Sequence, residues 1–406
     1  MDEYDVVIVG GGIAGSALAS VLAPRGLRVL VLERQTAYRD KVRGEFMVPW
    51  GVAEAVELGL DETLLAAGGV YSPNIASYGD HIDPVEARAA ALPLATLIPG
   101  VDGAMCVGHP QASEALNTRA TEQGADVLRG IGDVEVTAGP EPSVRYEFNG
   151  DIFEVRCRLV VGADGRQSTV RRGLGIELHQ EDSKATLGGM LVRCDWPDVM
   201  SFIGSEGDCY YLGFPRSDGI RVYLACEPSP STSGPDRAKH FLESFRLTSL
   251  PDSDRIADGE VAGPCSFYIG SDSWTARPVA DGVVLVGDAA GWSDPIIGNG
   301  LSVAMRDARS VAEVLLAGDD WSTDAFEPYV VERAERMRRL KIAGHVTTVN
   351  RCTFTDAGRA QRDAYRGQMM TDPLILGLVL TSVIGPETCP AEAFTDENID
   401  RVLNLA

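Results

Sequence analysis

The sequence has few basic residues for its length. Lys and Arg total 36 among 406 residues, against 59 Asp and Glu, and the formal net charge is −23. A surface of this sign repels nucleic-acid phosphates and anionic lipid head groups. We therefore expect neither a nucleic-acid partner nor association with an acidic membrane.

Metal-binding and disulfide patterns are also missing. The eight cysteines include no C-x-x-C pair, and none has a histidine at the spacing of a zinc site. Only five histidines are present, and none falls in the motifs described below, so a catalytic histidine relay is not expected. The sequence predicts reduced thiols in a cytoplasmic protein that holds no metal.

Long apolar segments are scarce as well. The longest late run, LILGLVLTSVIG at residues 374–385, has 12 residues, well short of the ~20 that a membrane helix needs. The first apolar run follows Asp2, Glu3 and Asp5, whereas a secretory signal peptide has a basic segment there. We expect no membrane span and no signal peptide, and the run at 374–385 predicts a buried or interface helix.

A glycine-rich turn opens the chain. Residues 5–34 read strand, turn, helix and strand, with Gly10, Gly12 and Gly15 in a G-x-G-x-x-G pattern and Glu33 at the end of the second strand. The first glycine allows a tight turn, the second lets the backbone approach a pyrophosphate, and the third lets the helix pack on the strand. The helix N-terminus attracts phosphate, and Glu33 can accept hydrogen bonds from ribose. This unit predicts a dinucleotide site without choosing between NAD and FAD.

The rest of the chain continues an α/β pattern that a β-rich insert interrupts. Residues 109–124 have helical spacing, a hairpin is predicted to turn at Asn149-Gly150, and the chain is mainly helical from residue 324. We expect an α/β fold with a Rossmann-like nucleotide-binding domain, an inserted antiparallel β-sheet domain for substrate, and a C-terminal helical region. The expected boundaries are 1–75, 100–181 and 275–325 for the nucleotide domain, 76–99 and 182–274 for the substrate domain, and 326–406 for the helical region.

Two further motifs indicate which dinucleotide, NAD or FAD, binds at this site. VVGADGRQSTVRR at residues 160–172 is a strand followed by Asp164-Gly165, and GVVLVGDAAGWSDPIIGNGLSVAMRDA at residues 282–308 ends a buried strand at Asp288. Together with the glycine turn and Arg43, these motifs resemble the para-hydroxybenzoate hydroxylase-like family of FAD-dependent aromatic monooxygenases, which has the glutathione-reductase type of FAD fold. The resemblance spans most of the first 310 residues and implies a resident FAD. No second glycine motif for a nicotinamide cofactor is present.

The resemblance also implies how FAD is held. Asp288 is expected to hydrogen-bond the ribityl chain, and the backbone from Gly298 to Leu301 to face the pyrimidine edge of the flavin, where a helix N-terminus stabilises negative charge. The full set of expected cofactor-binding residues is Gly10, Gly12, Ile13, Ala14, Gly15, Glu33, Arg34, Arg43, Gln111, Asp164, Asp288, Pro295, Gly298, Gly300 and Leu301.

The same resemblance implies oxygen chemistry. In such enzymes reduced flavin and O₂ give a C4a-hydroperoxide, and the protein places an electron-rich substrate beside it and excludes water. We expect Arg43 to stabilise negative charge at the flavin and Pro295 to shape its reacting edge. Asp294 is expected either to act as a general acid or base or to cap the next turn. Electrons are expected from NAD(P)H or from a separate flavin reductase.

The predicted substrate contacts are mostly apolar and aromatic: Phe46, Val48, Trp50, Tyr211, Phe214 and Trp292. Because no excess of Lys or Arg accompanies them, we expect hydroxylation or epoxidation of a neutral, largely apolar aromatic or polycyclic intermediate of natural-product biosynthesis, such as an indole-bearing or polyketide compound. The protein is expected to be a monomer or a homodimer.

The sequence departs from the family pattern at three positions, so other proteins of this fold stay as alternatives. Gly291 stands where the family commonly has histidine, while Asn299 and Ser302 replace Gln and Asn. Geranylgeranyl reductase-like enzymes, which reduce prenyl double bonds, share the GDAAG sequence. Flavin-dependent halogenases share the fold, but CYYLGFP at residues 209–215 lacks both tryptophans of their G-W-x-W-x-I-P strand. Rab GDP-dissociation inhibitors use a similar fold for binding alone, and the intact Glu33 and Asp288 argue against that role.

Overall fold

The residues that predict a βαβ unit form the centre of the larger sheet. The computed structural model describes residues 3–42, 44–226, 234–369 and 371–406, and its first elements are β1 (Glu3–Val9), α1 (Ile13–Leu22) and β2 (Val29–Glu33). The β-branched end of β1 is buried, as expected for a strand covered on both faces. A short 3₁₀ turn follows α1 and ends at Gly26, whose φ of 91° favours glycine.

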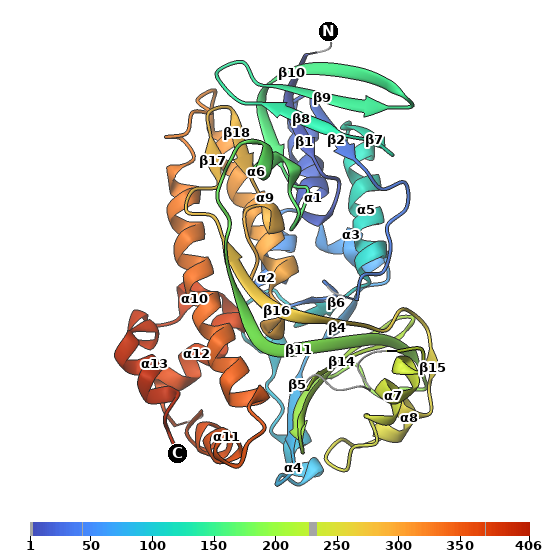
Figure 1. The fold of residues 1–406 in the computed structure, drawn as a ribbon, viewed down its shortest axis with the longest axis vertical. Helices are drawn as coiled ribbons and strands as arrows, with labels where there is room; N and C mark the ends of the chain where they lie inside the picture. Colours follow the sequence, from blue (N-terminus) through green and yellow to red (C-terminus); the bar gives the residue numbers. More distant parts are fainter. Residues whose placement is uncertain (1–2, 43, 227–233, 370) are drawn as a thin grey trace.

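An eight-stranded sheet forms the upper layer in Figure 1. Its path is β17-β18-β10-β1-β2-β7, and the strands from β18 to β7 run parallel, whereas β17 and the β8-β9 extension are antiparallel. Helices α5 and α9 pack against α1 beside this sheet. The remaining bounds in this layer are α5 (His109–Glu122), β7 (Asp126–Arg129), β8 (Val134–Thr137), β9 (Ser143–Phe148), β10 (Asp151–Gly162), α6 (Thr169–Gly173), β17 (Val279–Ala280), β18 (Val283–Leu285) and α9 (Gly300–Ala317).

The predicted hairpin is confirmed in its register. Asp151 pairs with Phe148, so Asn149 and Gly150 form a two-residue turn with φ values of 54° and 86°. Positive φ at both positions is the geometry that favours Asn-Gly in hairpins. The turn therefore follows from local sequence alone.

A seven-stranded sheet forms the lower layer, with the path β15-β11-β14-β13-β12-β5 and with β16 also paired to β11. Figure 1 shows the long strands β11 and β16 running from beside the upper layer into the lower one. Its strands are β5 (Ile75–Gly79), β11 (His179–Arg193), β12 (Ser201–Glu206), β13 (Cys209–Arg216), β14 (Gly219–Cys226), β15 (Glu260–Val261) and β16 (Ser266–Trp274). Its helices are α4 (Pro84–Ala89), α7 (Arg237–Glu243) and α8 (Ser253–Ala257). This membership supports the proposed domain division, which stays a prediction.

A three-stranded sheet, β3-β6-β4, and two short helices complete the central region. Their bounds are β3 (Phe46–Met47), α2 (Pro49–Glu57), α3 (Asp61–Ala66), β4 (Val70–Ser72) and β6 (Ala104–Cys106). One apolar cluster fills the space between the upper sheet and its helices, and a second covers the face of the lower sheet that turns toward α9 and α10. A third lies on the opposite face of the lower sheet, under α7 and α8.

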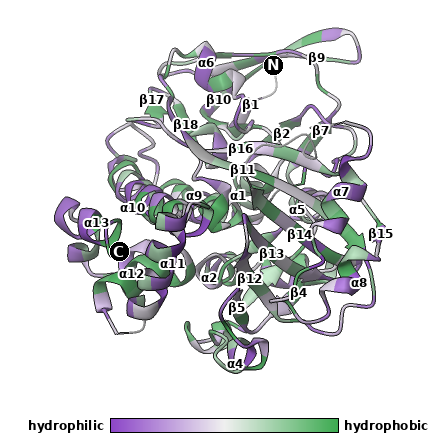
Figure 2. Ribbon diagram, turned by 60° about the horizontal axis from the view of Figure 1, so that its bottom comes forward, coloured by the Kyte–Doolittle hydropathy of each residue, from purple (hydrophilic) through white to green (hydrophobic). Residues whose placement is uncertain are grey.

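Four α-helices follow α9 in the described residues: α10 (Glu327–Cys352), α11 (Asp356–Met369), α12 (Pro373–Ile384) and α13 (Asp396–Val402). Figure 2 shows α12 as a largely hydrophobic helix beside the more hydrophilic α11 and α13. Helix α12 contains the apolar run from Leu374 to Ile384 and packs against α10. Within the described ranges no single helix is long and apolar enough to cross a membrane; α11 and α12 reach that length and composition only as a pair bent by 93°.

Candidate functional site

Three sequence motifs meet where parallel strands of the upper sheet end. The N–H of Ala163, after β10, donates to the carbonyl of Val9 in β1 over 2.7 Å. A methyl group added at Gly10 would lie 2.3 Å from the carbonyl oxygen of Ala163, and one at Gly287, after β18, would lie 3.2 Å from Cβ of Ala14. The glycine turn, the Asp164-Gly165 motif and the Gly287-Asp288 motif therefore border one crevice at the carboxyl ends of the strands, where such sheets bind nucleotides.

The glycine turn has the shape that a pyrophosphate needs. Gly10 has a φ of 109°, and a methyl group at Gly15 would lie 2.0 Å from the carbonyl oxygen of Gly10. At Gly12 an added methyl group would meet no atom of a described residue within 4 Å. Helix α1 starts at the next residue, Ile13, and no side chain of a described residue caps its free N–H groups. The turn thus fits the phosphates of FAD at the helix N-terminus, with Ile13 and Ala14 buried behind it.

Glu33 at the end of β2 is 6% exposed and fixes the local backbone. Its carboxylate accepts the N–H of Gly11 and the N–H of Gln35, each over 2.7 Å. The hydroxyl of Tyr38 donates to the carbonyl of Gly11, a contact that the sequence did not predict. Arg34 is exposed directly after β2. Ribose contacts of Glu33 and Arg34 stay predictions.

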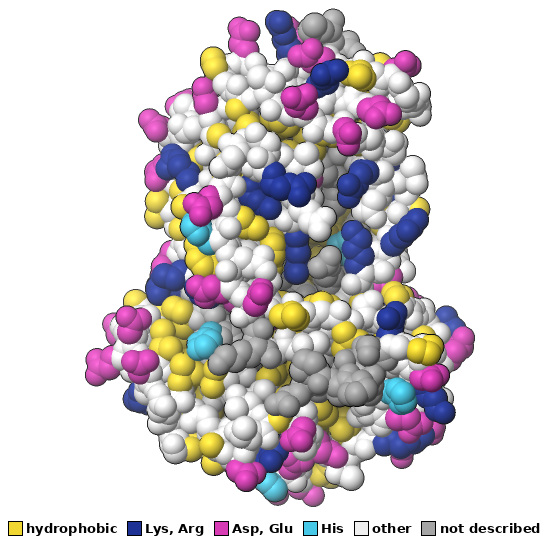
Figure 3. Space-filling view, viewed as in Figure 1, with side chains coloured by type: hydrophobic (Ala, Val, Ile, Leu, Met, Phe, Trp, Pro, Cys, Tyr) yellow, Lys and Arg dark blue, Asp and Glu magenta, His cyan; other side chains and the backbone are white. Residues whose placement is uncertain are grey.

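Basic side chains gather near this crevice although the chain is acidic. Figure 3 shows Lys and Arg side chains in a band across the middle of the molecule, around a hollow between the upper and lower layers. A concave site bordered by one sign of charge raises the local concentration of ligands of the opposite sign. The band is therefore complementary to an anionic dinucleotide.

Asp164 is partly committed to the fold and partly available to a ligand. One carboxylate oxygen accepts the N–H groups of Thr169 and Val170 over 2.6 and 3.1 Å, at the start of α6. The other, Oδ1, is buried without a hydrogen-bond partner among the residues that the structure describes. A buried acceptor of this kind fits a hydroxyl of a bound cofactor.

Asp288 lies at the surface of the crevice. Its side chain is 36% exposed and forms an ion pair with Arg166, whose Nε lies 3.2 Å from a carboxylate oxygen. The guanidinium of Arg166 also lies 4.9 Å from the ring centre of Trp292. A hydrogen bond from the ribityl chain to Asp288 is geometrically open and stays a prediction.

A buried ion network holds the Gly287-Asp288 turn from behind. The carboxylate of Asp307 in α9 accepts the N–H of Gly287 over 2.8 Å, and it pairs with Arg333 and Arg336 of α10 at 2.9 and 2.7 Å. Arg333 also donates to three carbonyls of the turn: those of Gly287, Ala290 and Gly291. Burial disfavours the charge on Asp307, but the two guanidinium groups prevail and lower its pKa.

These network residues were not among the sequence predictions, yet the sequence contains a signal for them. Asp307 lies four residues after Val303 and four before Val311, so it falls on the apolar stripe of an amphipathic helix. A carboxylate on that stripe is buried and needs charged partners. Only the fold shows that the partners come from α10.

The loop before α9, residues 294–299, forms the far wall of the crevice, and we name it the flavin-edge loop after its predicted role. Asp294 is 2% exposed and caps the 3₁₀ turn Pro295–Ile297 by accepting the N–H of Ile296 over 2.9 Å. Gly298 follows with a φ of 65°, and α9 starts at Gly300, where an added methyl group would meet no described residue within 4 Å. This open helix N-terminus, with Leu301 buried behind it, is a fitting place for the flavin edge. The capping role predicted for Asp294 is confirmed, and its acid–base role and that of Pro295 stay predictions.

A second carboxylate lies directly behind this loop. Asp272 of β16 accepts the N–H of Asp294 over 2.8 Å. Burial, with a further contribution from the charge of Asp294, raises the pKa of Asp272 to about 7. Its carboxyl group therefore titrates near neutral pH beside the flavin-edge loop.

Trp50 supports the flavin-edge loop. Its indole N–H donates to the side-chain oxygen of Asn299 over 2.8 Å, and the amide N–H of Asn299 donates to the carbonyl of Ile297 over 2.6 Å. Trp50 is 2% exposed and Asn299 is fully buried. A substrate contact of Trp50 stays a prediction, whereas its bracing of the loop is visible in the structure.

The predicted pocket residues Phe46 and Phe214 lie together on the side of the lower sheet that faces the crevice. Their rings stack at 4.3 Å, and a methyl group added at Gly298 would lie 3.2 Å from a ring carbon of Phe46. Val48 is buried in the same apolar cluster. These side chains connect the flavin-edge loop to the lower sheet.

The structure corrects the predicted position of Tyr211, whose side chain lies on the face of β13 that turns away from the crevice. Tyr211 lies on the opposite side of β13, fully buried under α7 and α8, and its hydroxyl shares a 2.7 Å hydrogen bond with Ser249. Side chains alternate along a strand, so the neighbouring Tyr210 lies on the crevice side with Leu212 and Phe214. Alternation was evident in the sequence, but not which face meets the crevice.

A buried charged cluster lies under these aromatic residues. Glu45 is 2% exposed and pairs with Arg216 at 2.6 Å and with Arg221 at 2.5 Å, and the hydroxyl of Tyr223 donates to it over 3.2 Å. Arg221 also reaches Asp40 at 2.6 Å. Burial raises the pKa of Glu45 to about 7 even though both arginines lower it. None of the sequence motifs described above includes this cluster.

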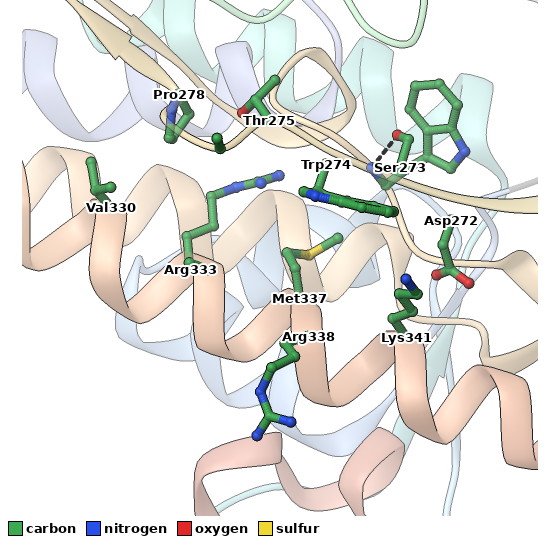
Figure 4. A pocket seen from close by; sticks show the side chains of 13 residues that line it. Asp272, Ser273, Trp274, Thr275, Pro278, Val330, Arg333, Met337, Arg338 and Lys341 are labelled. Carbon is green, nitrogen blue, oxygen red and sulfur yellow. Dashed lines mark hydrogen bonds between the residues drawn. The ribbon is translucent and has the colours of Figure 1, made fainter. Parts of the chain in front are cut away.

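Trp292 borders a separate cavity of 310 Å³ between β16 and α10. Figure 4 shows Trp274, Met337 and Lys341 of this cavity close together, with Trp274 from the strand and the other two from the helix. The indole N–H of Trp292 donates to the hydroxyl of Ser271 over 3.1 Å. Trp292 therefore contacts this cavity behind the flavin-edge loop, and its contact with substrate stays a prediction.

The structure does not test two of the predicted flavin contacts. Arg43 lies outside the described residues. Gln111 is exposed in the first turn of α5, near Gly108 and Arg216. A flavin contact of either residue stays a prediction.

Comparison with known proteins matches this geometry. Residues 3–341 match a family model described as an FAD binding domain. The chain is 30% identical to digeranylgeranylglycerophospholipid reductase 2 of Methanothermobacter thermautotrophicus over 77% of each chain. It is 27% identical to rifampicin monooxygenase of Streptomyces venezuelae, covering 81% of this chain and 68% of the relative.

Solved structures share the fold. The p-nitrophenol 4-monooxygenase PnpA from Pseudomonas putida superposes with a TM-score of 0.81 at 20% identity, over 95% of this chain and 99% of that one. The flavin-dependent brominase Bmp2 superposes with a TM-score of 0.74 at 20% identity, over 98% and 99%. The expected FAD-binding α/β fold is confirmed by the family match and these structures. The chain therefore belongs to the family defined by this FAD binding domain, and it is a flavin-dependent oxidoreductase.

Proposed function

We propose that the protein is a monooxygenase that uses FAD and O₂ to hydroxylate or epoxidise an electron-rich, largely apolar aromatic or polycyclic compound. The observation that carries the proposal is the meeting of three motifs at one crevice whose other wall is the flavin-edge loop and the aromatic pair Phe46 and Phe214. Reduced FAD bound there would activate O₂, which would supply the oxygen atom transferred to the substrate. Electrons would come from NAD(P)H or from a separate flavin reductase.

The residues of the chain would hold and orient the reactants. The turn at Gly12 and the start of α1 would bind the pyrophosphate, and the start of α9 would stabilise negative charge on the flavin. Asp307 and Arg333 would keep the turn at Gly287 in place. The apolar face around Phe214 would exclude water from the reacting atoms.

The test is spectroscopic and isotopic. The purified protein should carry a flavin absorbance that NADH or NADPH bleaches without oxygen, or that only a flavin reductase or dithionite bleaches if a partner supplies the electrons. Turnover of an aromatic substrate under ¹⁸O₂ should place one labelled atom in the product. Reduced protein that consumes oxygen yet never labels a product from a broad aromatic panel would contradict the proposal.

A second candidate function is reduction of a prenyl double bond. It is favoured by Gly291, which replaces a usual histidine and has a φ of 121°, and by the 30% identity to a digeranylgeranylglycerophospholipid reductase. An added methyl group at Gly291 would lie 2.5 Å from the carbonyl oxygen of Ser273, so a larger residue does not fit this backbone. An anaerobic experiment distinguishes the two functions. A prenyl alkene reoxidises the reduced flavin of a reductase, but not that of a monooxygenase.

A further inference from the structure

Three arginines gather where the C-terminal helices meet the lower sheet. Arg351 lies at the end of α10, with its guanidinium 6.0 Å from the ring centre of Tyr210. Arg362 of α11 lies 5.9 Å from the ring centre of Phe354. Arg366, one turn later, lies against the backbone of Gly79 in β5, where an added methyl group would be 2.7 Å from its Nη2. We name Arg351, Arg362 and Arg366 the arginine cluster.

The arginine cluster forms no ion pair with a carboxylate of the described residues. Among the residues that the structure describes, no carboxylate lies within 4.0 Å of any of the three guanidinium groups. Arg362 is 5% exposed: its Nη2 donates to the carbonyl of Thr353 over 3.3 Å, whereas its Nε is buried without a hydrogen-bond partner in the described part of the chain. The neighbouring Arg359 differs, because it pairs with Asp208 at 2.9 Å and with Asp356 at 3.1 Å. In a chain of net charge −23, the missing partners point to an external anion.

The local electrostatics agree with this geometry. Burial, and then the charge of Arg351, lower the pKa of both Arg362 and Arg366. The carboxylates that face the cluster and oppose this effect are Asp80 and Asp363. Crowded, poorly solvated guanidinium groups gain stability when a phosphate or carboxylate binds among them.

An apolar strip leads from the arginine cluster to the flavin-edge loop. Tyr210, Leu212 and Phe214 occupy alternate positions on the crevice side of β13, so the strip spans about 13 Å at the usual rise of a strand. Arg351 lies beside its Tyr210 end. At the other end Phe214 stacks on Phe46, next to Gly298 of the flavin-edge loop.

We propose that the arginine cluster binds the anionic head group, phosphate or carboxylate, of an elongated substrate whose apolar part lies along this strip toward the flavin. The inference rests on the proposed function, because it assumes that the reacting end lies at the flavin. It replaces the neutral substrate expected from the sequence with an acidic amphiphile. It also gives the C-terminal helices a role in substrate selection.

The test compares ligands that differ only in head group. Decyl phosphate, decanoate and decanol are titrated by calorimetry into the flavin-loaded full-length protein at low ionic strength. We expect the anionic ligands to bind about tenfold or more tightly than decanol, and added salt to weaken this preference. Arg351→Gln and Arg366→Gln should abolish the preference, and Arg359→Gln, a matched control on α11, should keep it.

Each outcome is informative. Tighter binding of decyl phosphate would indicate a phosphate head group in the substrate, and tighter binding of decanoate would indicate a carboxylate. Equal binding of all three ligands, or an equal loss in Arg359→Gln, overturns the inference. If circular dichroism shows that Arg366→Gln does not fold, the partly exposed Arg351 carries the test. Flavin-loaded protein that prefers the anionic ligands yet labels no product under ¹⁸O₂ would refute the proposed function and leave the head-group site standing.

Discussion

Replacing Asp307 with Asn tests whether the buried ion network positions the cofactor turn. Asp307 has no exposed surface, and the side chains of Arg333 and Arg336 are 3% and 2% exposed. The variant keeps an oxygen that can accept the N–H of Gly287 but removes the only charge that faces both guanidinium groups within the described network. We expect lower stability and weaker retention of FAD.

The magnitude follows from the burial of the pairs. Removing one partner of a buried ion pair costs about 3–5 kcal/mol. The lower end applies, since Arg336 keeps Glu332 at 2.9 Å and Arg333 keeps three carbonyl acceptors. An unfolding entropy of ~2 cal/mol/K per residue gives about 1 °C per kcal/mol for a chain of this length, so Tm should fall by about 3–4 °C.

Calorimetry of the flavin-free protein and fluorescence titration with FAD measure the two effects separately. The matched control is Glu313→Gln on the same helix, because Glu313 is 61% exposed and pairs with Arg309 at the surface. That variant should change stability by less than about 1 kcal/mol. The reasoning fails if Asp307→Asn matches the control in both Tm and FAD affinity.

Three further predictions concern the crevice. Gly12→Ala should weaken FAD binding about tenfold or more, because the methyl group occupies the space left for the pyrophosphate. The stability of the flavin-free protein should stay within about 1 kcal/mol. Gly173→Ala, where an added methyl group also meets no described residue, is the control in the same FAD titration. The pKa of Asp272 is about 7 in the folded protein and 3.8 ordinarily, so the free energy of unfolding should fall as pH rises between these values. In urea unfolding, Asp272→Asn should flatten this dependence of stability on pH. An unchanged dependence would contradict the raised pKa of Asp272. Trp50→Phe leaves the buried oxygen of Asn299 without its donor and should cost about 1–3 kcal/mol, measured by urea unfolding; a smaller loss means that Trp50 does not brace the loop.

Local patterns in the sequence predicted much of the fold and the motifs that border the crevice. The alternation of strand, glycine turn and helix at residues 5–34, and the hairpin turn at Asn149-Gly150, depend on backbone geometry within a few residues. The family resemblance, read from three motifs, is confirmed by the match over residues 3–341. These features could be predicted because each follows from a short segment.

The tertiary structure decided what depends on long-range packing. Tyr210 and Tyr211 alternate in the sequence, but only the packing of the lower sheet against α10 shows that Tyr210 faces the crevice. Likewise, the sequence places Asp307 on a helix face, and only the fold supplies Arg333 and Arg336 from another helix. The sequence by itself determined the nucleotide motifs and the order of elements, because these are local. Which side chains meet across elements was decided by tertiary structure, because burial and ion pairing depend on segments that are distant in the chain.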